Sequence, residues 1–248
     1  MIQDIHSHTK YSFCAHDAPE KMIETAIEAG IEVYGICDHN YGIGYADKNR
    51  FLNGEEAAFD EYFANLEAYR REINSLKGRY ADRIKLLCGI EICTSQRRAR
   101  VTLPHGMDLS GFDYCLLENI DDVEGSLAHG DLFGYAEELA CPVGIAHTDM
   151  FSFISRLGGD PYEYFCKMAD MGIFWELNVN FDATHQFREH RYVYELFEDA
   201  EKQDVIRRSG VALSVGFDCH KADQYLPERV KHACDKIEKL GLRMIELR

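Results

Sequence analysis

Seven short apolar segments of this chain each end in side chains that can bind a metal ion or form hydrogen bonds. The first is Asp4-Ile5-His6-Ser7-His8-Thr9, and the last is Gly216-Phe217-Asp218-Cys219-His220. Between them lie Cys37-Asp38-His39-Asn40, Gly89-Ile90-Glu91, Leu117-Glu118-Asn119, Ile145-Ala146-His147-Thr148-Asp149 and Glu176-Leu177-Asn178. This repeated placement is typical of parallel strands, whose carboxyl ends meet at one edge of a sheet.

The apolar runs alternate with amphipathic segments, which predicts a parallel sheet with crossover helices. Strands are expected at residues 2–6, 31–37, 84–91, 113–118, 142–146, 173–178 and 211–217. Helices are expected between Pro19 and Gly30, along a long face from Phe59 to Leu76, and at 131–139, 162–169, 192–208 and 227–240. The segment Tyr41-Gly42-Ile43-Gly44-Tyr45 is expected to form a loop over the rim of the sheet.

Two architectures fit seven such units in one domain of residues 1–248. An open doubly wound sheet gathers its site at one switch point, whereas a closed barrel brings every strand end to one rim. Because polar residues follow all seven strands, we expect an α/β fold of the irregular (β/α)7 TIM-like barrel type.

The charge and cysteine content exclude several classes of protein. A formal net charge of -16 opposes binding to a nucleic acid backbone. The nine cysteines are odd in number and form no C-x-x-C pair, so we interpret them as reduced core residues. No apolar run approaches the length of a membrane helix, and no signal-peptide region precedes Asp4, so a cytoplasmic location without membrane partners is expected.

Two pairs of side chains have the spacing of metal ligands. His6 and His8 are two residues apart and therefore share one face of an extended chain, and Asp218 and His220 repeat this spacing. Glu91 ends an apolar run, where a buried carboxylate needs a metal ion or a partner charge. A bridging metal ligand and a salt bridge to an arginine such as Arg97 are the two alternatives.

These motifs resemble, in order, those of the PHP (polymerase and histidinol phosphatase) superfamily of metal-dependent phosphoesterases. The resemblance spans nearly the whole chain and implies an irregular barrel that holds up to three ions. It implies that His6, His8, Glu91 and Asp218 surround one ion, that Glu91 bridges to a second ion with His147, and that His16, His39 and His220 hold a third.

One position departs from the family pattern. Many members carry a histidine shortly after the fourth strand, where this chain has Glu118-Asn119. Glu118 shares a side of the strand with Tyr114 and Leu116, so it is expected to face the metals as a ligand of the second ion. Pairing of Glu118 with an arginine at the rim is the alternative. Mixed nitrogen and oxygen ligands suit two or three divalent ions of zinc, manganese or iron.

The resemblance implies hydrolysis of a small phosphorylated metabolite, with a histidinol-phosphate-like monoester as the leading substrate, by a hydroxide formed at the metals. Glu91, His147 and Asp218 are the expected catalytic residues, and Arg156, Arg188 and Asn178 are the expected substrate-binding residues. His185 and His190 are candidate proton donors, and the general acid stays unassigned. The alternatives are a nuclease-like phosphodiesterase and a non-catalytic metal-binding module.

Overall fold

The computed structural model describes residues 1–96 and 102–247 of the chain. Its seven strands are all parallel and neighbour one another in chain order. They are β1 (Gln3–Asp4), β2 (Val33–His39), β3 (Lys85–Cys93), β4 (Tyr114–Glu118), β5 (Val143–Ile145), β6 (Phe174–Asn178) and β7 (Leu213–Gly216). All seven expected strands are confirmed.

Contacts between the first and last strands nearly close the sheet into a barrel. The backbone nitrogen of Ile5 donates to the carbonyl of Val215 at 3.0 Å, and the nitrogen of Asp218 donates to the carbonyl of His6 at 2.8 Å. A parallel bridge also joins Ser7 to Cys219. The irregular seven-stranded barrel expected from the sequence is therefore confirmed.

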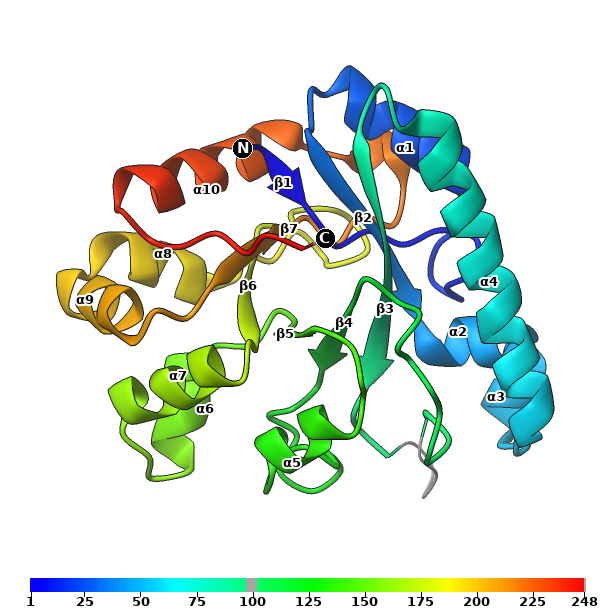
Figure 1. The fold of residues 1–248 in the computed structure, drawn as a ribbon, viewed down its shortest axis with the longest axis horizontal. Helices are drawn as coiled ribbons and strands as arrows, with labels where there is room; N and C mark the ends of the chain where they lie inside the picture. The colour runs from blue at the N-terminus through cyan, green and yellow to red at the C-terminus, as the bar shows by residue number, and fades with distance from the viewer. Residues whose placement is uncertain (97–101, 248) are drawn as a thin grey trace.

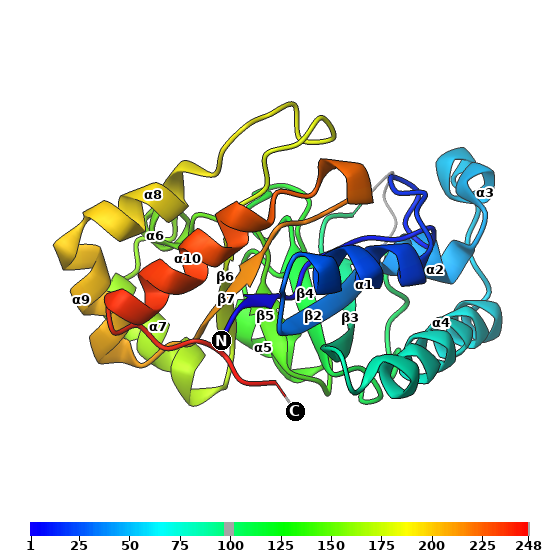
Figure 2. The ribbon, with the colours of Figure 1, turned by 90° about the horizontal axis from the view of Figure 1, so that it is seen from above.

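Helices surround the strands, as Figures 1 and 2 show. They are α1 (Pro19–Glu28), α2 (Asn40–Tyr45), α3 (Lys48–Asn53), α4 (Phe59–Tyr80), α5 (Leu132–Glu137), α6 (Met150–Arg156), α7 (Pro161–Asp170), α8 (Arg191–Glu198), α9 (Ala200–Ser209) and α10 (Pro227–Lys239), with a short 3₁₀ turn at Ala222–Gln224. In Figure 1, α1 and α4 lie beside β2 and β3, whereas α8, α9 and α10 lie on the side of β6 and β7.

Two expectations about connections are wrong. The segment from Asn40 to Tyr45 is a buried helix, α2, because its glycines allow close packing. A Cβ atom at Gly44 would lie 2.1 Å from the ring of Tyr62. The segment 192–208 is divided into α8 and α9 at Asp199, whose backbone is extended and whose carboxylate accepts hydrogen bonds from the nitrogens of Glu201 and Lys202.

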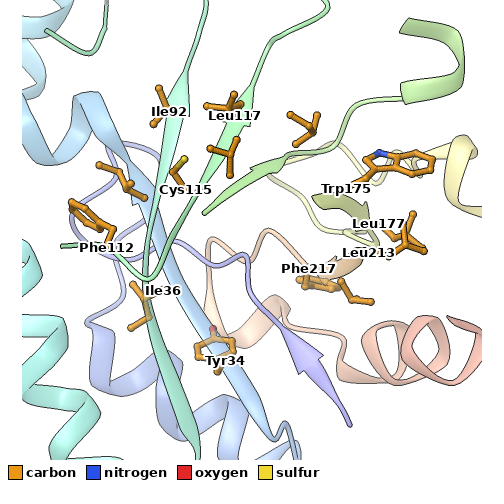
Figure 3. Packing of buried hydrophobic residues seen from close by; sticks show 14 of the residues in the cluster. Tyr34, Ile36, Ile92, Phe112, Cys115, Leu117, Trp175, Leu177, Leu213 and Phe217 are labelled. Atoms are coloured by element: carbon orange, nitrogen blue, oxygen red, sulfur yellow. The ribbon is translucent and has the colours of Figure 1, made fainter. Parts of the chain in front are cut away.

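Side chains of the strands alternate between two cores. Tyr34, Ile36, Leu117 and Trp175 point outward and pack under the helices (Figure 3). The other set, which includes Leu87, Tyr114, Leu116 and Phe174, fills the barrel interior. Because the period is two, residues His39, Glu91, Glu118 and Glu176 at the strand ends also point inward. The barrel interior therefore ends in a layer of polar groups at its carboxyl rim.

Tyr114 fills the space below this polar layer. Its ring lies beside Gly35 and Gly89, where added Cβ atoms would come within 2.2 and 2.3 Å of Tyr114 atoms. Its hydroxyl donates to the carbonyl of Ile5. The glycines therefore make room for a large side chain that supports the rim residues from below.

Candidate metal centre

One cluster of histidine and carboxylate side chains occupies the carboxyl rim of the barrel. His6 and His8 follow β1, His39 ends β2, Glu91 lies in β3, Glu118 ends β4, His147 follows β5, and Asp218 and His220 follow β7. All are buried except His147, which is partly exposed. The barrel thus brings together eight of the nine predicted metal ligands.

The first group within the cluster joins the two ends of the chain. The Nε2 atom of His8 lies 2.9 Å from Oδ1 of Asp218, and Nε2 of His6 lies 3.6 Å from the same oxygen. The two Nε2 atoms are 3.2 Å apart. His6, His8 and Asp218 therefore offer two nitrogens and one oxygen to a single point.

Glu91 lies at the middle of the cluster. Its Oε1 is 3.3 Å from Nε2 of His6 and 3.1 Å from Nε2 of His147, and its Oε2 is 2.8 Å from Nδ1 of His39. Both carboxylate oxygens thus face imidazole rings from different strands, as a bridging ligand requires. Arg97, the partner in the alternative interpretation, lies outside the described residues.

Glu118 also faces the cluster. Its Oε1 lies 3.5 Å from Nδ1 of His39, and Glu118, His39 and Glu91 have ligand atoms within 4.8 Å of one another. Among the described residues, no lysine or arginine pairs with Glu118. The geometry agrees with the inward orientation predicted from the alternation in β4. Glu118 is grouped with His39 and Glu91, and its role as a ligand of the second ion stays a prediction.

A third group contains His8, His39 and His220. The structure does not bring His16 into this group, because His16 is exposed in the loop between β1 and α1, and its role as a ligand stays a prediction. Cys14 lines the site instead. Burial alone would raise the pKa of the Cys14 thiol, but hydrogen bonds with His220 and His39 outweigh burial and lower that pKa to about 7.

The donor atoms fit divalent ions. Within the described part of the chain, His39 Nδ1, Glu91 Oε2, Glu118 Oε1 and Asp218 Oδ1 are buried without a hydrogen-bond partner, although they lie close together. Buried polar atoms of this kind cost free energy unless something satisfies them. Cations between these four converging atoms would satisfy them in a mixed nitrogen and oxygen shell.

The electrostatics of the cluster agree with a site for divalent cations. Burial disfavours a charge on His6, but the carboxylates of Glu176, Glu91 and Asp218 outweigh it and raise its pKa well above the usual value. Burial and the neighbouring rings of His220 and His39 instead lower the pKa of His8. The carboxylates therefore favour positive charge at His6, and bound divalent cations would supply positive charge at the same place.

The loop after β1 is held by a buried carboxylate behind the cluster. Asp38 accepts hydrogen bonds from the backbone nitrogen of Thr9 at 2.6 Å and from the hydroxyl of Ser12 at 2.7 Å. The Ser12 hydroxyl in turn lies 3.1 Å from Nδ1 of His8. Asp38 therefore orients His8 through Ser12. This contact gives Asp38 a role in the site although its side chain does not point into the barrel.

Three strand-end residues have backbone conformations that non-glycine residues seldom adopt. The φ angles are 61° at Asn119, 24° at His147 and 55° at Asp218. Such conformations cost about 1–3 kcal/mol each and concentrate at functional sites. At His147 and Asp218 the turn directs the side chain over the rim toward Glu91 and His8.

The structure does not bring the predicted substrate-binding residues into the cluster. Arg156 ends α6 and pairs with Asp121 at 3.4 Å on the surface. Arg188 is exposed in the loop before α8. Asn178 is buried, and its amide donates to Glu176 Oε2 at 3.2 Å, which places it behind the cluster. Roles for these three residues in substrate binding stay predictions.

Two acidic residues near the cluster were not predicted. Glu176 is fully buried and contacts His6, and its inward orientation follows from its position two residues after Phe174 in β6. Asp182 binds Nδ1 of His185 at 2.8 Å, and Nε2 of His185 lies 3.0 Å from Asp218. Asp182 lies in an irregular loop, where no sequence periodicity indicates its orientation.

The cluster opens into a cavity of about 290 Å³. It is lined by Cys14, His39, Tyr41, Glu91, Glu118, His147, His185, His190, Asp218 and His220. The two candidate proton donors, His185 and His190, therefore lie at the cavity with the proposed ligands. A cavity of this size admits a small molecule. No helix in the described part of the chain is long and apolar enough to span a membrane.

Comparisons with known proteins agree with this geometry. A family model described as "PHP domain" matches residues 4–240. The chain is similar to histidinol phosphate phosphatase of Lactococcus lactis subsp. lactis, solved with zinc, L-histidinol and phosphate, with 19% identity and a TM-score of 0.58 over 98% of this chain and 95% of that chain. A Listeria monocytogenes protein provisionally described as a histidinol phosphatase has 15% identity and a TM-score of 0.47 over 89% and 96% of the two chains. No curated protein sequence gives a significant match.

Proposed function

This chain belongs to the PHP domain family, and we propose that it hydrolyses a small phosphate monoester, with histidinol phosphate as the leading candidate. At the coarser level it is a metal-dependent phosphoric ester hydrolase. The observation that carries the proposal is the convergence of buried, unsatisfied nitrogen and carboxylate atoms on residues that line the rim cavity.

We propose two or three divalent ions of zinc, manganese or iron as the cofactors. His6, His8 and Asp218 would hold one ion, Glu91 would join neighbouring ions, and His39, Glu118, His147 and His220 would complete the shells. Divalent ions at such a site supply activation of water and neutralisation of phosphate charge. The zinc in the Lactococcus lactis relative supports this metal class.

The residues of the chain define how a substrate would be placed. The residues that line the cavity include the carboxylates of Glu91 and Asp218 and the side chains of Tyr41, His185 and His190. The volume of about 290 Å³ matches a small metabolite. The net charge of -16 would repel the phosphate backbone of a polynucleotide, which disfavours the nuclease-like alternative. Histidinol and phosphate in the Lactococcus lactis relative support the choice of substrate.

The proposal is tested by turnover of three substrates with zinc-, manganese- or iron-loaded protein. These are histidinol phosphate, a chromogenic phosphate monoester and the corresponding diester. We expect kcat/KM to be highest for histidinol phosphate and lowest for the diester. A preference for the diester would favour the nuclease-like alternative. Absence of turnover in protein whose metal content has been verified would favour a non-catalytic metal-binding module.

A further inference from the structure

Glu176 connects two predicted ligands that come from different strands. Its Oε1 lies 2.7 Å from Nδ1 of His6, and its Oε2 accepts a hydrogen bond from the backbone nitrogen of His147 at 2.8 Å. The amide of Asn178 donates to the same Oε2 at 3.2 Å. Glu176 is 0% exposed, so its carboxylate depends on these donors for stabilisation.

The contact with His6 determines which ring nitrogen carries a proton. An ionised carboxylate only accepts hydrogen bonds, so Nδ1 of His6 must donate to Oε1. The other nitrogen, Nε2, faces His8 Nε2, Glu91 Oε1 and Asp218 Oδ1 at 3.2, 3.3 and 3.6 Å. Glu176 therefore leaves Nε2 as the ring atom that can bind a cation in the cluster.

A glycine on the neighbouring strand makes this contact sterically feasible. A Cβ atom at Gly216 would lie 2.0 Å from Glu176 Oε1 and 2.6 Å from the Cβ atom of His6. The φ angle of Gly216 is not positive, so no special backbone conformation requires glycine there. The space beside Gly216 is occupied by the Glu176 carboxylate and the His6 side chain.

The second oxygen of Glu176 holds a strained backbone. His147 has a φ angle of 24°, and its nitrogen donates to Oε2. This hydrogen bond supports the turn that directs the His147 ring toward Glu91, at 3.1 Å. One carboxylate thus orients the side chain of His6 and the backbone of His147.

We propose that Glu176 is a positioning residue of the metal centre, which fixes the His6 tautomer and the His147 turn, and that Gly216 is required to admit it. The proposal rests on the metal centre of the proposed function. It does not depend on the identity of the substrate. Partners of ligating histidines commonly change metal affinity by about 10- to 100-fold when they are removed.

The first measurement is zinc affinity, determined by competition with a chromogenic chelator. Glu176→Gln keeps the size of the side chain but can accept on only one oxygen, so it cannot serve all three donors. Gly216→Ala keeps every donor and charge, and its added Cβ atom displaces the Glu176 carboxylate and the His6 side chain from their contact. We expect both variants to lose affinity by about 10- to 100-fold. Ser214→Ala, a buried change two residues earlier in β7, is the matched control and should bind zinc as the wild type does.

The second measurement is the proton on Nδ1 of His6, observed by nitrogen-15 NMR of histidine-labelled protein and assigned by its loss in His6→Gln. We expect it in the wild type with and without zinc. In zinc-free Glu176→Gln we expect a mixture of the two ring tautomers, because the carboxylate that requires Nδ1 to donate is gone. Wild-type zinc affinity in both variants, or a His6 ring without an Nδ1 proton in the wild type, would overturn the proposal. Because neither measurement uses turnover, failure of the phosphatase assay would leave this inference standing.

Discussion

The Nε2 atom of His8 lies 2.9 Å from Oδ1 of Asp218, so the first and last ligand motifs of the chain meet where β1 and β7 close the barrel. The closure is reinforced below them, because the hydroxyl of Tyr225 donates to the Asp4 carboxylate at 2.7 Å and the nitrogen of Phe217 donates to it at 3.0 Å. The metal centre is therefore a property of the closed barrel and does not belong to any single motif.

Replacement of His8 by alanine should abolish phosphoester hydrolysis in metal-supplemented protein. The ring is buried between Asp218 and Glu91, and its loss removes a nitrogen from two of the ligand groups. Steady-state turnover and far-UV circular dichroism are the measurements. His105→Ala is the control, because the His105 side chain is 91% exposed and is not among the residues that line the rim cavity. Comparable turnover in the two variants would contradict the assignment of His8.

Chelation should remove activity, and added divalent transition metal should restore it. The reason is that water activation in the proposed mechanism comes from the ions, and no side chain is assigned as the nucleophile. The measurement is turnover before chelation, after chelation and after zinc, manganese or iron is added back, with metal content determined analytically. Equal rates in the chelated and loaded proteins would refute the metal requirement.

Glu118→Gln should weaken the binding of one ion and spare the others. The Glu118 Oε1 atom is buried and unsatisfied beside His39, and a glutamine there keeps the size of the side chain but loses the charge. Metal titration by calorimetry, with stoichiometry checked after gel filtration, distinguishes the outcomes. If stoichiometry and affinity both match the wild type, Glu118 does not ligate.

Gly44→Ala should destabilise the protein by about 1–3 kcal/mol, because the added methyl group overpacks the contact between α2 and Tyr62. The free energy of unfolding in denaturant is the measurement. Gly78→Ala is the matched control, since Gly78 lies in α4 with open space around its Cβ position, and alanine there should be neutral or stabilising by up to about 1 kcal/mol. Equal effects of the two substitutions would argue against close packing of α2.

Sequence patterns predicted the barrel and placed most residues of the cluster at strand ends. Strand positions followed from apolar runs, and the period of two predicted that Glu118 points to the same side as Tyr114 and Leu116, as the structure confirms. His6 and His8 could be paired with Asp218 only through the family resemblance, because local patterns do not specify which distant motifs meet. The prediction of a loop at residues 41–45 was wrong. The helix α2 found there packs closely against Tyr62 at Gly44, and this contact with another element is not visible in the local sequence.

Tertiary structure decided the remaining roles. Glu176 and Asn178 both point inward from β6, and only the space beside Gly216 in the next strand admits the carboxylate to His6. In the loop after β1, no periodicity distinguishes Cys14 from His16, and the path of the backbone places the thiol inside and the imidazole outside. The sequence therefore determines which residues lie at strand ends, because apolar runs and local alternation define the strands. Contacts within the cluster depend on neighbouring strands and on the paths of loops, which local patterns do not encode.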